Sequence, residues 1–156
     1  QLVGSLNAAE DVTIDSSGNL IVCDTANHKV LKYTLTSTNN FNQTPTVIAG
    51  GNGSGSALNQ LTSPTFVESN SDGSITVLDN GNDRVVKWAP GASQGVVVVG
   101  GNGRGSNLNQ LAGPYSIYLD KNNTAKNLKG FLKCFFIIKK HQVIYNCIQL
   151  SNLESY

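Results

Sequence analysis

A chain of 156 residues has room for one domain with a hydrophobic core and little room for a second. Sixteen glycines, no methionine and 13% charged residues are typical of a loop-rich β protein rather than a long helix or a charged disordered segment. Residues 1–124 hold six cations against nine acids, a net charge of −3, whereas residues 125–156 hold five lysines and one glutamate, a net charge of +4. The acidity of the longer part argues against nucleic-acid binding, which depends on Lys and Arg at phosphates.

The chain start, the apolar runs and the cysteines bear on the compartment, on membrane association and on metal binding. Because residue 1 is not Met, we interpret the chain as cut from a longer product, and the compartment stays open. The apolar runs are too short to span a bilayer, so no membrane association is expected. Three cysteines without a C-x-x-C pair and two histidines give no zinc set, so neither a metal nor another cofactor is expected. Cys23 is expected to be a buried strand residue.

Short β-branched segments separated by turn formers predict four strands in the first part of the chain. Residues 16–19 and 25–28 are the predicted turns, and the stretch TSTNNFNQT is expected to be a long surface loop. The predicted strands are residues 12–14, 20–23, 30–33 and 46–49.

The glycine-rich stretch IAGGNGSGSALNQL (48–61) follows the last of these strands and resembles a phosphate-binding loop only in composition. A phosphate loop needs a helix start beyond it, and here another predicted strand follows, without a Gly-Lys-Ser/Thr motif. The stretch VVGGNGRGSNLNQL (98–111) repeats it at ten of fourteen positions. We therefore predict a connector that uses glycine for positive φ angles.

The rest of the chain repeats the first plan. NSDGSITVLDNGNDRVVKW (70–88) aligns with DSSGNLIVCDTANHKVLKY (15–33) at an offset of 55, and GPYSIYLDKNNT (113–124) aligns with residues 63–74. The second set of strands is predicted at residues 66–68, 74–78, 84–88 and 95–99. Four antiparallel strands about every fifty residues indicate β-propeller blades, which bury their faces by stacking.

The run from Asp15 to Tyr33 resembles the NHL repeat through its Gly, Asp, Asn27-His28 and Lys positions, and the second unit carries the variant DNGNDR. The resemblance covers roughly residues 9–124. It implies an all-β fold of NHL-type propeller blades, here an incomplete propeller, with family rings that are often six-bladed. It also implies a general habit of binding partners and no single activity. Some propellers of this family hold metal through channel histidines, but no such role is assigned to His28.

The repeats predict five segments. Residues 1–8 end a preceding blade or linker, 9–62 form the first unit, 63–112 the second, 113–124 begin a third, and 125–156 are a non-repeat tail. Because glycine usage falls and the charge changes sign at the tail, our hypothesis is that it is translated non-coding or frame-shifted sequence. The alternative is a genuine ending that packs against the open blade edge. If the chain is complete as written, self-association is expected, since open blade faces remain.

The conspicuous turn residues are interpreted as structural. Asp24 and Asp79 each end a strand, where a carboxylate can accept N–H bonds from the residues that follow, while Asn27 and Asn82 tolerate a left-handed φ. Paired carboxylates for acid–base chemistry or Ca²⁺ are the disfavoured alternative, because equivalent positions of successive blades lie apart. The complete set of structural turn residues is Gly18, Asp24, Asn27, Gly73, Asp79 and Asn82.

A second set of residues forms the candidate partner-binding surface. Two lysines alternate with apolar neighbours and each precedes an aromatic residue, while an arginine replaces Ser54 in the second glycine loop. Packing between blades is the alternative role for the aromatic residues. The set is Lys32, Tyr33, Lys87, Trp88 and Arg104.

These observations favour a non-catalytic NHL-repeat binding scaffold with a protein partner and no assigned catalytic residue. The first alternative is a propeller lyase or hydrolase whose metal or catalytic residues lie in blades outside this sequence. RNA binding needs a basic, aromatic surface, which the net charge of −3 disfavours. Carbohydrate binding is compatible with the Asn-x-Ser/Thr sequons at Asn42, Asn52 and Asn122.

Overall fold

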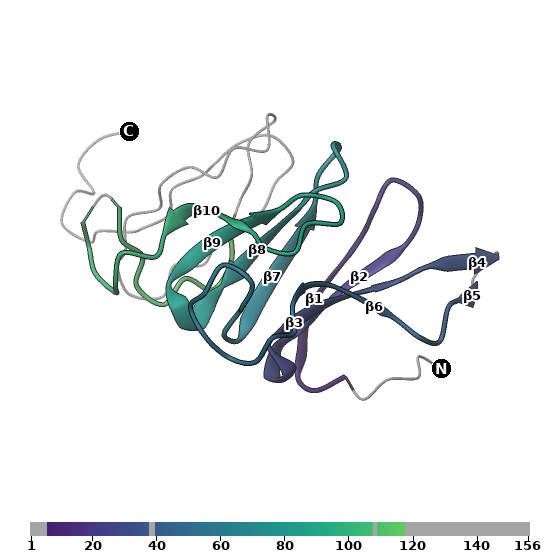
Figure 1. Cartoon of the computed structure of the whole chain (residues 1–156), viewed down its shortest axis with the longest axis horizontal. Coiled ribbons are helices and arrows are strands. Elements are labelled where there is room, and N and C mark those ends of the chain that lie inside the picture. Colours follow the sequence, from purple (N-terminus) through teal and green to yellow (C-terminus); the bar gives the residue numbers. More distant parts are fainter. Residues whose placement is uncertain (1–5, 38–39, 108, 118–156) are drawn as a thin grey trace, which may run out of the picture.

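The computed structural model describes residues 6–37, 40–107 and 109–117. Two four-stranded antiparallel sheets dominate this part of the chain and lie side by side in Figure 1, the first in purple and blue and the second in teal and green. The first sheet contains, in spatial order, β1 (Ala9–Ile14), β2 (Leu20–Asp24), β3 (Lys29–Tyr33) and β6 (Thr46–Gly50). The second contains β7 (Pro64–Ser69), β8 (Ile75–Asp79), β9 (Arg84–Trp88) and β10 (Val96–Gly100).

All eight predicted strands are found, and each sheet follows chain order apart from the hairpin inserted before β6. The largest boundary difference is at β1, which begins at Ala9 rather than residue 12. Short runs of apolar and β-branched residues identify these strands well, because strands such as β2, β8 and β9 are buried along almost their whole length.

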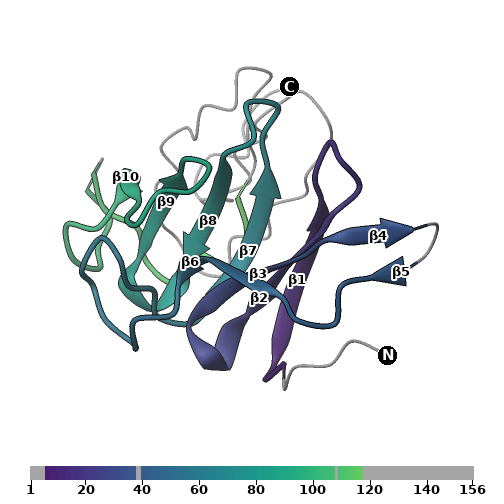
Figure 2. The same cartoon turned by 45° about the vertical axis from the view of Figure 1, so that its right-hand side comes forward.

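The structure corrects the prediction of a long surface loop over residues 36–44. This part of the chain forms a hairpin of β4 (Leu35–Ser37) and β5 (Asn40–Phe41), in which Leu35 pairs with Phe41. The hairpin projects from the first sheet, away from the second sheet (Figures 1 and 2). Its Phe41 packs against the buried Val22, Leu31 and Tyr33, which gives the hairpin a hydrophobic anchor.

A short 3₁₀ turn joins the second and third strands of each sheet. η1 (Thr25–Asn27) ends at His28 with φ 55°, and η2 (Asn80–Asn82) ends at Asp83 with φ 48°. The left-handed residue is therefore the one after the asparagine, not the asparagine itself as predicted. Asp is among the few side chains that tolerate this region, which suits the second turn.

The main hydrophobic core lies between the two sheets. It joins apolar residues of β2, β3 and β6 to apolar residues of β7, β8 and β9, and Leu61 of the connector completes it. Cys23 is fully buried here, as predicted. The members are Ile21, Cys23, Val30, Ala49, Leu61, Val67, Ile75, Val77, Val86 and Trp88.

Each sheet also buries residues on its other face. In the first sheet these are Val22, Leu31 and Tyr33, and in the second they are Phe66, Leu78 and Val85, with Leu111 and Ile117 packed on them. Leu111 follows the second glycine connector as Leu61 follows the first. Each connector thus delivers a leucine into an apolar layer, which is the stacking arrangement that the repeats predict.

The glycine stretches are connectors, as predicted. Gly50 and Gly100 have φ of 68° and 75°, and each places its backbone against the left-handed turn residue of its own sheet. A Cβ on Gly50 would lie 2.5 Å from the His28 carbonyl oxygen, and a Cβ on Gly100 would lie 2.2 Å from that of Asp83. Neither position can take a side chain without local rearrangement.

The sequence hypotheses about the C-terminal part lie largely outside the described residues. The third unit is described only to residue 117, and the 125–156 tail is not described. The five-segment division and the origin of the tail therefore stay predictions.

Candidate functional site

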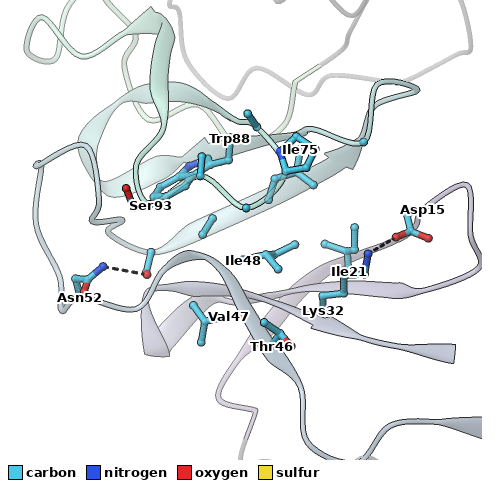
Figure 3. A pocket seen from close by; sticks show the side chains of 17 residues that line it. Asp15, Ile21, Lys32, Thr46, Val47, Ile48, Asn52, Ile75, Trp88 and Ser93 are labelled. Atoms are coloured by element: carbon cyan, nitrogen blue, oxygen red, sulfur yellow. Dashed lines mark hydrogen bonds and ion pairs between the residues drawn. The ribbon is translucent and has the colours of Figure 1, made fainter. Parts of the chain in front are cut away.

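A groove of about 450 Å³ separates the outer parts of the two sheets. Its first side is formed by β6 and by residues of β2 and β3, and its second side by β8 and the loop that follows β9. Figure 3 shows Ile21, Ile48, Ile75 and Trp88 together in this space, with Ser93 on the loop beside the indole. The groove exists because the sheets share a core near their inner strands, while the 89–93 loop stands opposite β6.

The apolar lining of the groove is continuous with the main core. Ile21, Ile75 and Trp88 are buried members of that core, and the partly buried Ile48 packs against it. Trp88 pairs in register with Ile75, so the ring lies over the β8–β9 ladder. The Cε2–Nε1 edge of the indole lies against Gly95, where a Cβ would come within 2.8 Å. The indole N–H is buried and has no hydrogen-bond partner among the described residues, so the ring presents an apolar surface to them.

An ion pair closes one end of the groove. Lys32 Nζ lies 2.8 Å from Asp15 Oδ2, and the lysine side chain keeps 33% of its surface exposed. Burial raises the pKa of Asp15, but hydrogen bonds from Lys32, Asn19 and Ser17 outweigh it and lower the pKa to about 2. The second sheet repeats the pair as Lys87 and Asp72 at 3.0 Å, and neither of these residues lines the groove.

Acid should remove the Asp15 contribution to stability. A carboxylate whose folded pKa is about 2, against an ordinary 3.8, stabilises the fold above pH 4 and loses that contribution between about pH 4 and pH 2. We expect Asp15→Asn to be less stable than the parent at pH 6, and the difference in free energy of unfolding should narrow steadily below pH 4. Urea unfolding at several pH values measures this difference. A gap that does not change with pH would show that Asp15 acts through its shape alone.

Only part of the predicted partner surface comes together. Lys32 and Trp88 line the same groove. Tyr33 is fully buried in the opposite face of the first sheet, against Leu20 and Phe41, which places it in the packing role rather than on a surface.

The two remaining predicted surface residues lie apart from the groove. Lys87 is engaged with Asp72, and the Arg104 guanidinium lies close to Gly113. Trp88, although it borders the groove, is only 3% exposed. The two aromatic residues of the predicted surface are therefore more buried than the sequence pattern suggests, whereas Arg104 is exposed.

Asp79 is the centre of a hydrogen-bonded turn, but not in the predicted way. Its Oδ1 accepts the backbone N–H of Thr62 at 2.6 Å, and Oδ2 accepts from Asn82 at 2.7 Å. The backbone donor thus precedes Asp79 by 17 residues, directly after the connector, rather than following it. Burial raises the pKa of Asp79, and these hydrogen bonds together with the Arg84 charge oppose the rise.

Arg84 joins this turn to the first glycine connector. Its Nε lies 2.7 Å from Asp79 Oδ2, and the side chain is 5% exposed. The guanidinium also donates to three carbonyl oxygens of the connector: to Ser56 at 2.6 Å, Ala57 at 3.1 Å and Gln60 at 2.9 Å. A planar guanidinium with several donors suits such a set of acceptors better than a lysine does.

The first sheet has a weaker version of the same arrangement. Asp24 accepts the backbone N–H of Asn7 at 2.7 Å and both of its oxygens accept from Asn27. Lys29 stands at the position of Arg84, with Nζ 3.7 Å from Asp24 Oδ2. Asn27 and Asn82 each donate a hydrogen bond to the aspartate that precedes their turn.

The glycines Gly18 and Gly73 lie in the tight turns between the first two strands of each sheet. Their φ angles are 81° and 78°, a region that glycine occupies at little strain. Gly18 N–H donates to the Asp15 carbonyl and Gly73 N–H to the Asn70 carbonyl. The structure thus places both in turns, and Gly73 also borders the groove.

His28 makes a contact that sequence reasoning missed. Its Nδ1 accepts the backbone N–H of Ser63 at 3.0 Å, 35 residues away, just before β7. Asp83, its counterpart, accepts the N–H of Gly113 at 2.6 Å. The signal was present in the sequence, since His28 and Asp83 share a position at the offset of 55 and both can accept a hydrogen bond.

Exchange at position 28 should distinguish the acceptor role from a generic turn role. His28→Ala removes the acceptor of the Ser63 N–H, and we expect a loss of about 1–2 kcal/mol in the free energy of unfolding. His28→Asp restores an acceptor that the second unit uses and should lose less than half as much. Urea unfolding of both variants measures this. Equal losses would contradict the acceptor role.

The described residues hold no group of three or more His, Cys, Asp or Glu side chains that could bind a metal ion. Within the groove, Asp15 and Lys32 are the titratable residues of the lining. No helix in the described part of the chain has the length and apolar character needed to cross a membrane.

Comparison with known proteins supports the sequence interpretation of the fold. Residues 6–33 match the family model of the NHL repeat. The structure is similar to that of an auxiliary nutrient binding protein from Bacteroides thetaiotaomicron VPI-5482, with a TM-score of 0.54 and 18% sequence identity. The match covers 72% of this chain and 32% of that protein, so this chain spans about a third of its length. No curated protein sequence matches the chain.

With the two antiparallel four-stranded sheets, these matches confirm the predicted fold class, NHL-type blades of an incomplete β-propeller.

Proposed function

We propose that this chain, whose residues 6–33 form an NHL repeat, is part of a non-catalytic binding scaffold and that its partner is a protein. The groove between the sheets carries the proposal. It combines an apolar lining from Ile48, Ile75 and Trp88 with a charged end at Lys32. Recognition sites on proteins commonly pair an apolar anchor position with a polar rim.

The groove geometry favours a peptide segment with one apolar side chain. A volume of about 450 Å³ is enough for a large side chain and its flanking backbone. The Lys32 ammonium beside this volume is half-buried and pairs with Asp15, and its remaining donors favour a carbonyl or carboxylate on the partner. The description of the structural neighbour as a nutrient binding protein agrees with a binding role for this type of fold.

Trp88 supplies a direct signal for the test, because it is the one tryptophan of the chain and borders the groove. Peptides selected from a random displayed library against the intact chain should change Trp88 fluorescence on titration. Ser93→Arg places a long side chain at the groove, and we expect it to weaken binding at least about tenfold. Gln94→Arg changes the adjacent exposed residue outside the lining and should leave binding unchanged.

Equal binding to the parent and to Ser93→Arg would rule out the groove as the site. Selected peptides that bind without changing Trp88 emission would also place the site elsewhere. Circular dichroism of both arginine variants confirms that the loop substitutions leave the sheets folded.

A further inference from the structure

The edge strand β6 forms one wall of the groove along its whole length. It stands at the end of the first sheet, and among the described residues β3 is the strand that pairs with it. Side chains of a strand point alternately to its two faces, so a groove that lies against a face is lined by every second residue. Every residue of β6 lines this groove: Thr46, Val47, Ile48, Ala49 and Gly50. The groove therefore follows the edge of β6 that is turned away from β3.

The first part of this edge is accessible to a partner. Thr46 and Val47 are exposed and Ile48 is partly buried, whereas the last two residues of the strand are buried. Proteins commonly protect sheet edges with charged residues or proline. β6 has the sequence TVIAG, which contains neither, and Pro45 stands before the strand. Residues 46–48 thus present an uncharged edge on which another strand can pair.

The accessible edge meets the apolar lining at Ile48. The pairing of β6 with β3 passes from Val47 to Ala49 and skips Ile48, which makes Ile48 a bulge residue. A bulge redirects the side chain of the extra residue and disrupts the strand locally. Figure 3 shows Ile48 in the groove with Ile21 and Ile75. Pairing along the edge is therefore expected to stop at the bulge, next to the apolar part of the groove.

The wall opposite β6 offers little to a peptide backbone. It includes the loop of residues 89–93, which contains no charged residue. Pro90 has no N–H, and Ala92 N–H donates to the Ala89 carbonyl at 3.1 Å. A peptide in the groove would therefore find partners for its backbone on the β6 side.

The volume of the groove favours an extended peptide over a helix. One turn of a helix about 10 Å across occupies about 420 Å³, so a groove of about 450 Å³ holds little more than one turn. Isolated helices that short are unstable. An extended peptide spans residues 46–48 within about 10 Å, and it needs hydrogen-bond partners for its backbone because the rest of the lining is largely apolar.

We propose that the groove holds an extended segment of a protein partner as a fifth strand of the first sheet, paired with residues 46–48 of β6. This inference rests on the proposed function and gives the bound partner its conformation. The segment places one apolar side chain against Ile48 and Trp88, and the next side chain on either side points out of the groove. Both walls consist of described residues, so the site does not depend on a further blade.

The test uses a library-selected peptide whose binding Ser93→Arg weakens, with each backbone amide of the peptide N-methylated in turn. A methyl group removes the N–H donor and adds bulk on the side that meets β6. Since a strand directs every second amide to one neighbour, we expect losses of at least about tenfold at alternate positions of the central segment. Methylation at the positions between them should change binding much less.

Hydrogen exchange of the full ¹⁵N-labelled chain locates the pairing on the protein. At saturation with the parent peptide, at least one amide of residues 46–48 should exchange at least about tenfold more slowly. β10 is the matched control, because it is the corresponding end strand of the second sheet and its residues do not line the groove. Exchange of the β10 amides should stay unchanged.

The outcomes separate this inference from the proposed function. Methylation losses without alternation, or unchanged exchange of residues 46–48 at saturation, would overturn the strand pairing and leave the groove as the binding site. Failure to select any peptide that is sensitive to Ser93→Arg would overturn the proposed function and the strand pairing together.

Discussion

Replacing Arg84 with methionine is expected to lower the free energy of unfolding by about 3–5 kcal/mol at pH 7, the usual effect of breaking a buried ion pair on one side. The substitution removes the partner of Asp79, whose side chain is fully buried, and four hydrogen bonds from one guanidinium. Methionine keeps the length of the stem, so the loss reports on the polar contacts rather than on packing.

The pH dependence of this loss follows from Asp79. Burial already raises the pKa of Asp79 in the parent, and removing the cation raises it further. A carboxyl group with a raised folded pKa favours the fold at low pH and opposes it as pH rises and the group ionises. The loss in free energy of unfolding caused by Arg84→Met should therefore be larger at pH 7 than at pH 4. Urea unfolding at both pH values measures this loss.

Lys29→Met is the matched control, because Lys29 occupies the equivalent position of the first sheet. Its ammonium lies 3.7 Å from Asp24, and its side chain is 29% exposed, so we expect a loss below about 1 kcal/mol. Similar losses in the two variants would show that Arg84 acts as a surface ion pair and that its bonds to the connector contribute little.

The contrast between Arg84 and Lys29 shows what the sequence could and could not predict. Strands, turns and the repeat follow from local patterns: short runs of apolar, β-branched residues mark the strands, and glycine or aspartate marks the turns. The offset of 55 places Arg84 and Lys29 at one position. It does not show that Arg84 reaches three carbonyls of a connector 24 to 28 residues earlier, because that contact depends on how one sheet stacks on the next.

The groove shows the same limit. Lys32 alternates with apolar residues and Trp88 is the aromatic residue after Lys87, and the structure brings the two to one groove from different sheets. Tyr33 has the same sequence context as Trp88 but lies in another layer, packed with Phe41 of a hairpin that the sequence did not reveal. Which face of a strand meets a neighbouring sheet is decided by the stacking, and Ile48 and Ser93 carry no motif that identifies them as lining residues.

Replacing Trp88 with alanine is expected to destabilise the fold by about 3–5 kcal/mol, since it leaves a large cavity in the main core. The ring is 3% exposed, shares the core with Ile75 and lies against Gly95 at its Cε2–Nε1 edge. Urea unfolding followed by far-UV circular dichroism measures the loss, because the variant has no tryptophan.

Trp88→Phe separates packing from polarity at the same position. In the part of the chain that the structure describes, the indole N–H has no hydrogen-bond partner. Phenylalanine therefore gives up contact area but none of the described hydrogen bonds, and we expect it to lose less than half of what alanine loses. A loss as large as that of alanine would mean that the N–H has a partner in solution. The same ring borders the groove, so Trp88→Phe should keep peptide binding and Trp88→Ala should weaken it. The packing of the core and the shape of the proposed binding surface therefore depend on the same side chain.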